Sequence, residues 1–445
     1  MCHFKRLLRV GSACLACLCA SLVAAAQPDE PPPDPLSVPW ILDRVAEQNL
    51  TVLLNQTEVE EALQETFRQR AGLLPAVSVE ASQTRSQFVN VGRGFGDIGS
   101  PPPSSRFDAR LAASLTLFDA TVYANWRLAK LGYRISELGH DSLLQDVQRE
   151  AVRAFFVHLR NRARLEAIDA NIERSRQLLE LARNQFEAGV ATSIDVTRAE
   201  VALARDEQSR LQQESVVLSS ELRLKTLLNL DLDTPIQTEV PDIDVATLPT
   251  GMPQPDLKAV LERRPDYKQA EQLLEQAILT RRAARFQRLP RISLFGDYGL
   301  ASAEAFDGRE DETWAAGITL SFPLFEGLSI PADTARAQAR VRAREFAIAD
   351  LRNTINRDLL IARQELESRY AQIAAARKTA RLRDRELELA RARFRSGTGD
   401  NRDIVDAQNG VAQADDQVIE AVYFYNLARL DYARALGEVR RVTRP

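Results

Sequence analysis

Histidines and glycine motifs provide no recognisable catalytic site in this sequence. His140 and His158 lie eighteen residues apart in one predicted helix, which is not the spacing of metal ligands. The segment 94–99 fits GxGxxG, but prolines at 101–103 stand where a dinucleotide-binding fold needs a helix. No GxSxG or GxxxxGK segment occurs. We therefore predict a protein that is not an enzyme, with no catalytic residues, no metal site and no cofactor.

Two aspartates are the other candidates for chemistry. Asp403 and Asp406 stand three residues apart in a predicted helix, so their carboxylates share one helix face. Such a pair is typical of a solvated face. Around an opening shared by several copies, the same pair would favour cations over anions. The elements that carry these aspartates decide between the two interpretations.

The segment 1–26 has the pattern of an export signal, in which three cations precede an apolar stretch and a cleavage site at Ala26. All four cysteines lie in this segment, so the predicted mature chain has no thiol; acylation at Cys17 is the alternative to cleavage after Ala26. Without the three cations the formal net charge changes from −4 to −7, which gives no reason to expect a nucleic-acid partner. After residue 26, no uncharged apolar run reaches the roughly 18 residues that a spanning helix needs.

The chain repeats itself after about 208 residues. The segment 179–189, LELARNQFEAG, returns at 387–397 as LELARARFRSG, and an aspartate follows six residues after each final glycine, at Asp195 and Asp403. The period is far too long for a solenoid unit and indicates that half of a domain was duplicated.

Each half passes through the same series of periodicities. Helical patterns cover 41–73, 121–188 and 194–229 in the first half, and 256–288, 333–395 and 403–437 in the second. Alternating, strand-like patterns cover 75–90, 106–119, 291–302 and 313–325. A helix of some 60 residues is about 90 Å long, so these helices must pack side by side in an elongated body. We predict a signal peptide at 1–26, a first repeat at 27–229, a Pro-rich connector at 230–255, a second repeat at 256–437 and a tail at 438–445.

The predicted strands have one apolar and one polar face. Strands of about ten residues with this alternation are long enough to cross an outer membrane, with the apolar side to lipid. Four strands cannot close a barrel, and open edges are not tolerated in lipid, so three copies with twelve strands are expected. Aromatic residues near the strand ends form an interfacial belt or pack in the core: Trp40, Phe118, Trp126, Trp314 and Phe325.

These features resemble the TolC-like outer-membrane efflux proteins. The resemblance rests on the duplicated halves, a Leu-Pro pair before each first strand (74–75 and 289–290), the tripeptide 264–266 (Arg-Pro-Asp) and the glycine-containing hairpin turns. It implies a mainly α fold with a β-barrel: a homotrimer whose helices form a coiled-coil-like periplasmic tunnel below a 12-stranded barrel in the outer membrane of a Gram-negative bacterium. It also implies a passive exit duct of an efflux or type I secretion system, with a periplasmic adaptor and an inner-membrane transporter as partners.

The resemblance assigns roles to particular residues. It implies that Asp403 and Asp406 ring the pore entrance and that Asp195 restrains the closed entrance by pairing with a basic residue of the second turn. The expected basic position is Gly399, so Arg402, three residues on, is the candidate partner. The two turns, Ala188-Gly189-Val190 and Ser396-Gly397-Thr398, are implied to receive the adaptor.

One alternative function fits part of the pattern. A periplasmic coiled-coil adaptor or scaffold of an export system also has long helical hairpins, but it needs one hairpin rather than two, and no strand pairs with a lipid-facing side. The exported substrate and the energy source of the pump are not encoded in any pattern of this sequence.

Overall fold

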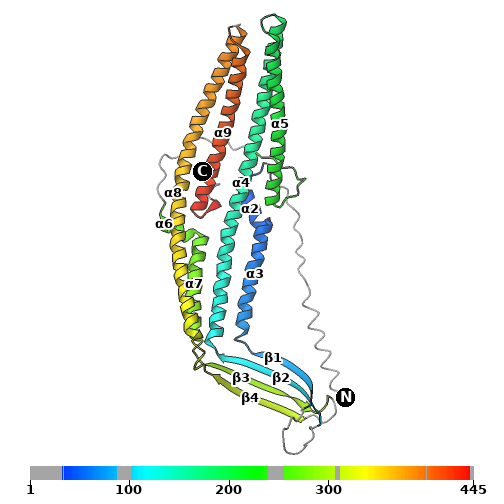
Figure 1. Ribbon diagram of the computed structural model, residues 1–445, viewed down its shortest axis with the longest axis vertical. Coiled ribbons are helices and arrows are strands. Elements are labelled where there is room, and N and C mark those ends of the chain that lie inside the picture. Colours follow the sequence, from blue (N-terminus) through cyan, green and yellow to red (C-terminus); the bar gives the residue numbers. More distant parts are fainter. Residues whose placement is uncertain are drawn as a thin grey trace, which may run out of the picture.

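The computed structural model describes residues 33, 35–87, 102–238, 255–305, 311–396 and 398–440. Within these residues the protein is an elongated bundle of helices with a four-stranded sheet at one end and two helical hairpin tips at the other (Figure 1). Outside them lie the predicted signal segment with Cys17, the glycine segment 94–99, most of the connector 230–255, the last residues of the tail, and Gly397.

The two halves of the chain fold in the same order. The first half contains α2 (Val38–Gln48), α3 (Leu50–Ala71), β1 (Ala76–Ser86), β2 (Ser104–Phe118), α4 (Ala120–Glu187) and α5 (Ser193–Leu227). The second half contains α6 (Leu257–Arg263), α7 (Pro265–Phe286), β3 (Arg291–Ser302), β4 (Asp311–Ser321), α8 (Ser329–Arg395) and α9 (Asn401–Ala435). The helices α4 and α8 have 68 and 67 residues, so each is about 100 Å long.

The predicted helices 41–73 and 256–288 are each divided in two. At Asn49 the backbone is extended, and its side chain accepts hydrogen bonds from the backbone of Thr51 and Val52, which starts a new helix. Arg264 is extended because Pro265 follows it, and Pro265 is the first residue of α7. Helical periodicity continues through both breaks, so the pattern alone did not predict them.

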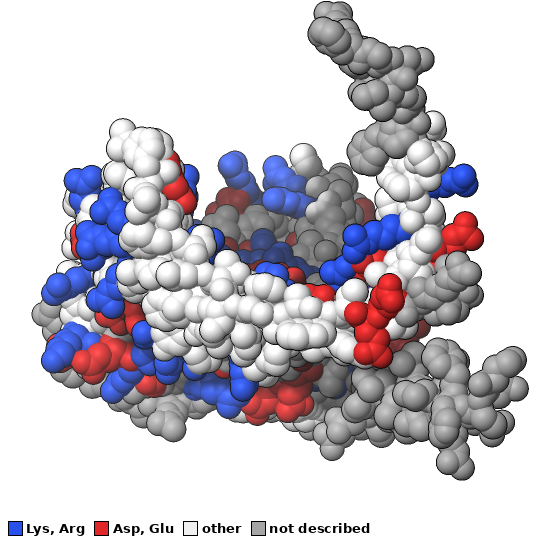
Figure 2. All heavy atoms as spheres, turned by 90° about the horizontal axis from the view of Figure 1, so that it is seen from below, with Lys and Arg blue, Asp and Glu red and all other residues white. Residues whose placement is uncertain are grey.

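The sheet has the order β1-β2-β3-β4, with all neighbours antiparallel. One row across the four strands joins Val79, Leu111, Tyr298 and Trp314, and all four side chains are at least half exposed. The next row joins Glu80, Arg110, Gly299 and Thr313. One face is therefore apolar and the other polar, as the alternation predicted. Seen from below, uncharged side chains form a curved band at this end, with charged ones beside it (Figure 2).

The main apolar core lies half-way along the bundle, where α2 packs against α4, α5 and α9. It includes Ile41, Val45, Leu224 and Leu430, each nearly inaccessible to solvent. Trp40 packs against this core and is not among the aromatic residues near the strand ends. None of the described helices combines the length and the apolar character that crossing a membrane requires.

The tripeptide 264–266 fastens the start of α7 to the end of α9. Arg264 is 8% exposed; its guanidinium donates a hydrogen bond to the Ala435 carbonyl (3.2 Å) and a second to the Asp266 carboxylate. Burial alone would raise the pKa of Asp266, but the adjacent Arg264 guanidinium outweighs it and holds the pKa below its usual value. Gly437 follows α9 at φ +81°, and a Cβ there would stand 2.8 Å from Cγ of Arg264. The side chain of Arg264 thus fills the space beside the glycine.

His158 is a buried histidine of α4. The side chain is 1% exposed, and its Nδ1 lies 3.2 Å from Ser220 Oγ. Burial lowers the pKa of His158 from its usual 6.5, an effect opposed by Glu221 and reinforced by Arg162. Below pH 6.5 His158 therefore binds a proton in the unfolded chain more readily than in the native chain. The free energy of unfolding consequently decreases as the pH falls from 6.5 toward the lowered pKa, and His158 does not affect it above pH 6.5.

We expect the midpoint temperature of thermal unfolding to decrease as the pH is lowered from about 7 to about 5. In the variant His158→Gln the decrease should be smaller, because the titrating imidazole is absent. The midpoint is measured by circular dichroism on the two proteins in parallel. His140, a half-buried histidine whose Nδ1 lies 3.2 Å from Asn55 Oδ1, provides the control His140→Gln. An unchanged slope in the His158 variant would contradict the assignment.

Candidate functional site: the hairpin tips

The first hairpin turn closes with a Schellman motif. Gly189 adopts φ +73°, its amide donates to the Phe186 carbonyl (3.0 Å), and the Val190 amide donates to the Gln185 carbonyl (2.9 Å). No atom lies within 4 Å of a Cβ built at Gly189, so its left-handed backbone, rather than crowding, requires glycine. The apolar side chain of Val190 is 65% exposed at the tip.

The second turn repeats this arrangement. The Thr398 amide donates to the Arg393 carbonyl (3.0 Å), in the position of the Val190 bond of the first turn. The hydroxyl of Ser396 donates to the same carbonyl (2.9 Å). Gly397 itself is outside the described residues.

The two repeated aspartates occupy the same position in their helices, the third residue after the cap. Asp195 forms a capping box with Thr192, whose amide donates to its carboxylate (2.9 Å). Asp403 stands in the first turn of α9, where Asp400 serves as the cap and accepts from the Arg402 amide (3.0 Å). A carboxylate in the first turn stabilises a helix, which accounts for both aspartates without any pore.

Asp403 and Asp406 lie on the exposed side of α9. The Asp406 carboxylate pairs with Arg402 at 3.7 Å, and these side chains are 69% and 75% exposed. An exposed pair of this kind contributes little to stability. The pair does place a cation among the carboxylates at the tip, which the sequence pattern did not predict.

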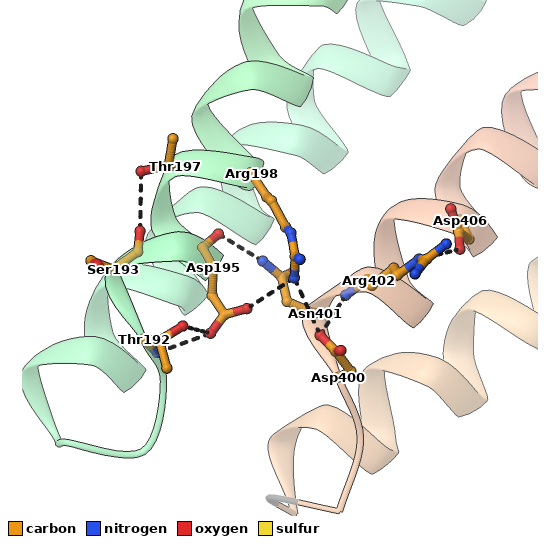
Figure 3. A network of polar contacts seen from close by, with 9 residues as sticks. All are labelled: Thr192, Ser193, Asp195, Thr197, Arg198, Asp400, Asn401, Arg402 and Asp406. Carbon is orange, nitrogen blue, oxygen red and sulfur yellow. Dashed lines mark hydrogen bonds and ion pairs between the residues drawn. The ribbon is translucent and has the colours of Figure 1, made fainter.

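The side chains of Asp195 and Arg402 do not meet within the described part of the protomer. Arg402 faces Asp406 instead, and Asp195 is occupied by its capping box and by Arg198, whose guanidinium lies 3.8 Å away (Figure 3). Arg198 also reaches Asp400 of the second hairpin at 3.9 Å. At the tips, among the residues that the structure describes, Arg198 rather than Arg402 is the cation that lies between the two hairpins.

Asn401 joins the two hairpins through a buried side chain. It is 1% exposed, and its Nδ2 donates to the backbone carbonyl of Asp195 at 2.7 Å (Figure 3). Neither Asn401 nor Arg198 was predicted as a site residue. Arg198 stands one repeat period before Asp406, so opposite charges at equivalent positions were a signal in the sequence. Asn401 follows a helix cap, and nothing in its local pattern indicated burial.

A small apolar core and further polar contacts hold the hairpins together behind the tips. Leu178, Phe394, Ile404 and Val411 are among the buried residues of this core, which draws on α4, α5, α8 and α9. Gln408 donates to the Arg174 carbonyl at 3.1 Å, and Arg174 pairs with Asp415 at 3.4 Å. Burial raises the pKa of Asp415 above its usual value and outweighs the adjacent Arg174, which acts in the opposite direction.

The sheet has an uncovered apolar face, which is typical of a protein that contacts a membrane, and the long hairpins end in a polar cluster. The family model described as "Outer membrane efflux protein" matches residues 41–230 and 257–438. The chain therefore belongs to the outer membrane efflux protein family. It is a passive efflux channel of the outer membrane and not an enzyme. The family gives no support to the adaptor alternative.

Individual relatives agree with this assignment. The chain is 27% identical to the probable efflux pump outer membrane protein TtgC of Pseudomonas putida over 83% of its own length and 76% of that protein. It is 30% identical to the outer membrane protein OprJ of Pseudomonas aeruginosa over 56% and 52% of the two chains. The fold matches the CmeC outer membrane channel of Campylobacter jejuni with a TM-score of 0.78 and 19% identity, covering 90% of this chain and 85% of that one. It matches VceC of Vibrio cholerae with a TM-score of 0.75 and 16% identity, covering 90% and 96%.

Proposed function

We propose that three copies of this chain close one twelve-stranded barrel and one helical tunnel, through which a substrate delivered from the periplasm leaves the cell. The proposal is carried by the sheet, in which β1 and β4 are the edge strands, and the outer edge of each has no partner strand among the described residues. Eight strands from two copies would give a barrel just wide enough to be filled by side chains, whereas twelve would leave a lumen. The polar row with Glu80 and Arg110 requires such a wet interior.

The experiment is the mass of the purified protein in detergent, measured by light scattering, followed by insertion into a planar bilayer. We expect three protomers per particle and discrete conductance steps, because the β4 edge of one copy pairs with the β1 edge of the next. A stable monomer that does not insert would contradict the proposal. A particle mass of two protomers together with conductance steps would support a channel but would contradict the proposed number of three copies.

At the other end we propose that the hairpin tips form the entrance and receive a periplasmic adaptor, which links the duct to an inner-membrane transporter. Apolar side chains at the first tip favour docking: Val190 and Ile194 are 65% and 55% exposed, with Phe186 nearby at 48%. TtgC and OprJ are themselves outer membrane proteins, and TtgC is part of an efflux pump by name. The turns 188–190 and 396–398 are the docking residues in this proposal.

The closed entrance is proposed to depend on the contacts between the hairpins. Asn401 and Arg198 hold the second hairpin to the Asp195 region of the first, while Asp403 and Asp406 face the aperture. Arg402 offsets part of that negative charge through its pair with Asp406. In this proposal Asp195 still restrains the entrance, but through its backbone carbonyl and Arg198.

A further inference from the structure

A groove on the first turns of α4 combines aromatic and cationic side chains. Its volume is ≈ 660 Å³, and its lining includes Tyr123, Trp126, Arg127, Lys130 and Arg134. The rings of Tyr123 and Trp126 are 5.7 Å apart, and Lys130 Nζ lies 5.3 Å from the centre of the Trp126 ring. Nothing in the proposed transport mechanism uses this groove.

The groove lies next to the sheet. β2 ends at Phe118 and α4 begins at Ala120, so Arg127 is about 10 Å along the helix from its start. Side chains of an α-helix tilt toward its N-terminus, which in α4 is the end next to the sheet. Long cationic side chains on these turns therefore extend toward the membrane, with their apolar stems along the helix and their charge at the headgroup level.

The helices that flank α4 leave the groove side open. His140 of α4 contacts α3 through Asn55, and the adjacent Gly139 approaches Gln269 of α7. Consecutive residues such as Gly139 and His140 are about 100° apart around the helix axis. The contacts of α4 with α7 and α3 therefore lie within about 100° of each other, and the remaining wide arc of the α4 surface faces neither helix. The groove residues on α4 are spaced by 4, 3 and 4 and fall in that wide arc. In a curved wall of helices the wide arc is the convex, outer face.

The charges of the groove favour an anion. Neither Arg127 nor Arg134 forms a salt bridge within the part of the chain that the structure describes. Two carboxylates, Glu137 and Glu275, also line the groove. Three cations against two carboxylates leave one net positive charge, next to aromatic rings of the kind found at membrane interfaces.

We propose that this groove binds the headgroup of an anionic phospholipid in the periplasmic leaflet of the outer membrane. The inference rests on the proposed membrane placement of the sheet. The cations attract the phosphate, the Tyr123 and Trp126 rings lie at the level where chain and headgroup meet, and the lipid fixes the height of the channel in the membrane. A basic residue near an anionic membrane surface is worth about 1 kcal/mol, so one net charge corresponds to about a fivefold preference over a zwitterionic lipid.

Tryptophan fluorescence of the full oligomer in lipid vesicles tests the proposal, because the chain has three tryptophans, Trp40, Trp126 and Trp314. One variant, with Trp40→Phe and Trp314→Phe, reports on the groove through Trp126. Another, with Trp40→Phe and Trp126→Phe, reports on insertion through Trp314, which is 75% exposed on the apolar face of the sheet. The quenchers are spin-labelled phosphatidylglycerol and spin-labelled phosphatidylcholine, compared at equal mole fraction.

We expect phosphatidylglycerol to quench Trp126 with about fivefold higher apparent affinity, and the combined change Arg127→Gln, Lys130→Gln and Arg134→Gln to abolish the preference. Glu275→Gln should increase it, because a repelling carboxylate is removed. Equal quenching of Trp126 by both lipids, with Trp314 quenched normally, would overturn the lipid site and leave the channel intact. Failure to quench Trp314 would overturn the membrane placement and this proposal with it.

Arg340 and Arg344 provide a matched control. They lie at a similar depth on α8 and line a separate groove of ≈ 390 Å³ with Leu273 and Ala277 of α7. Glu275 is two residues from each of these α7 residues, so the two grooves lie on opposite sides of α7. Arg340→Gln with Arg344→Gln should leave the preference unchanged. Loss of the preference in this control would overturn the assignment to α4.

Discussion

Replacing Asp403 and Asp406 by asparagine lowers the cation-over-anion permeability ratio of the reconstituted channel by about tenfold. The expectation follows from Coulomb energies, since a unit charge 4 Å away in water contributes about 1 kcal/mol and three protomers would bring six carboxylates around one aperture. Asparagine keeps the shape of each side chain and removes only its charge. The ratio is obtained from the reversal potential of single channels in a salt gradient, and the effect should shrink at high salt because the charges are exposed.

A matched control separates the entrance from the general charge of the tunnel. Glu58 and Glu61 on α3 are likewise exposed, three residues apart and on a helix far from the tips. Glu58→Gln with Glu61→Gln should leave the ratio unchanged. Equal effects of the two double variants would show that the aspartates do not surround the constriction. Arg402→Gln should change the ratio in the opposite direction, because it removes the cation paired with Asp406.

Loosening the contacts between the hairpins should open the entrance. Asn401→Ala removes a partly buried hydrogen bond to the Asp195 carbonyl, and Arg198→Gln removes the cation that lies between Asp195 and Asp400. One hydrogen bond is worth about 1 kcal/mol, or about a fivefold shift toward the open state per protomer. Three protomers moving together would shift the equilibrium about a hundredfold. We expect the double variant to show a larger single-channel conductance and a larger open fraction than the wild type.

The control for this prediction makes the same two types of substitution, Asn→Ala and Arg→Gln, at positions whose contacts stay within one hairpin. Asn426, 5% exposed, bonds to Val422 in its own helix, and Arg183 pairs with Glu200 across the first hairpin at 2.8 Å. Asn426→Ala with Arg183→Gln should cost similar stability without raising the conductance. If this variant opened the channel as much as the first, general destabilisation would account for the effect and the proposed restraint would be wrong.

Much of the fold could be predicted because its signals are local and repeated. The alternating segments around β1 to β4 showed which face of the sheet is apolar, since strand side chains alternate with period two. Gly189 predicted the first turn because a left-handed residue is required there. The breaks before α3 and α7 were missed, because Asn49 and Pro265 each occupy a helix start inside a continuous apolar pattern.

The sequence by itself determined the duplicated architecture, the strands with one apolar face and the membership of an outer-membrane channel family, because each depends on residue patterns within a single element or on their repetition. The partners of the candidate site were decided only by the tertiary structure. Asn401 and Asp195 are 206 residues apart, and whether Asp195 meets Arg198 or Arg402 depends on the rotation and height of α9 against α5. Local spacing does not encode these two quantities; they are set by side-chain packing along the whole length of the helices.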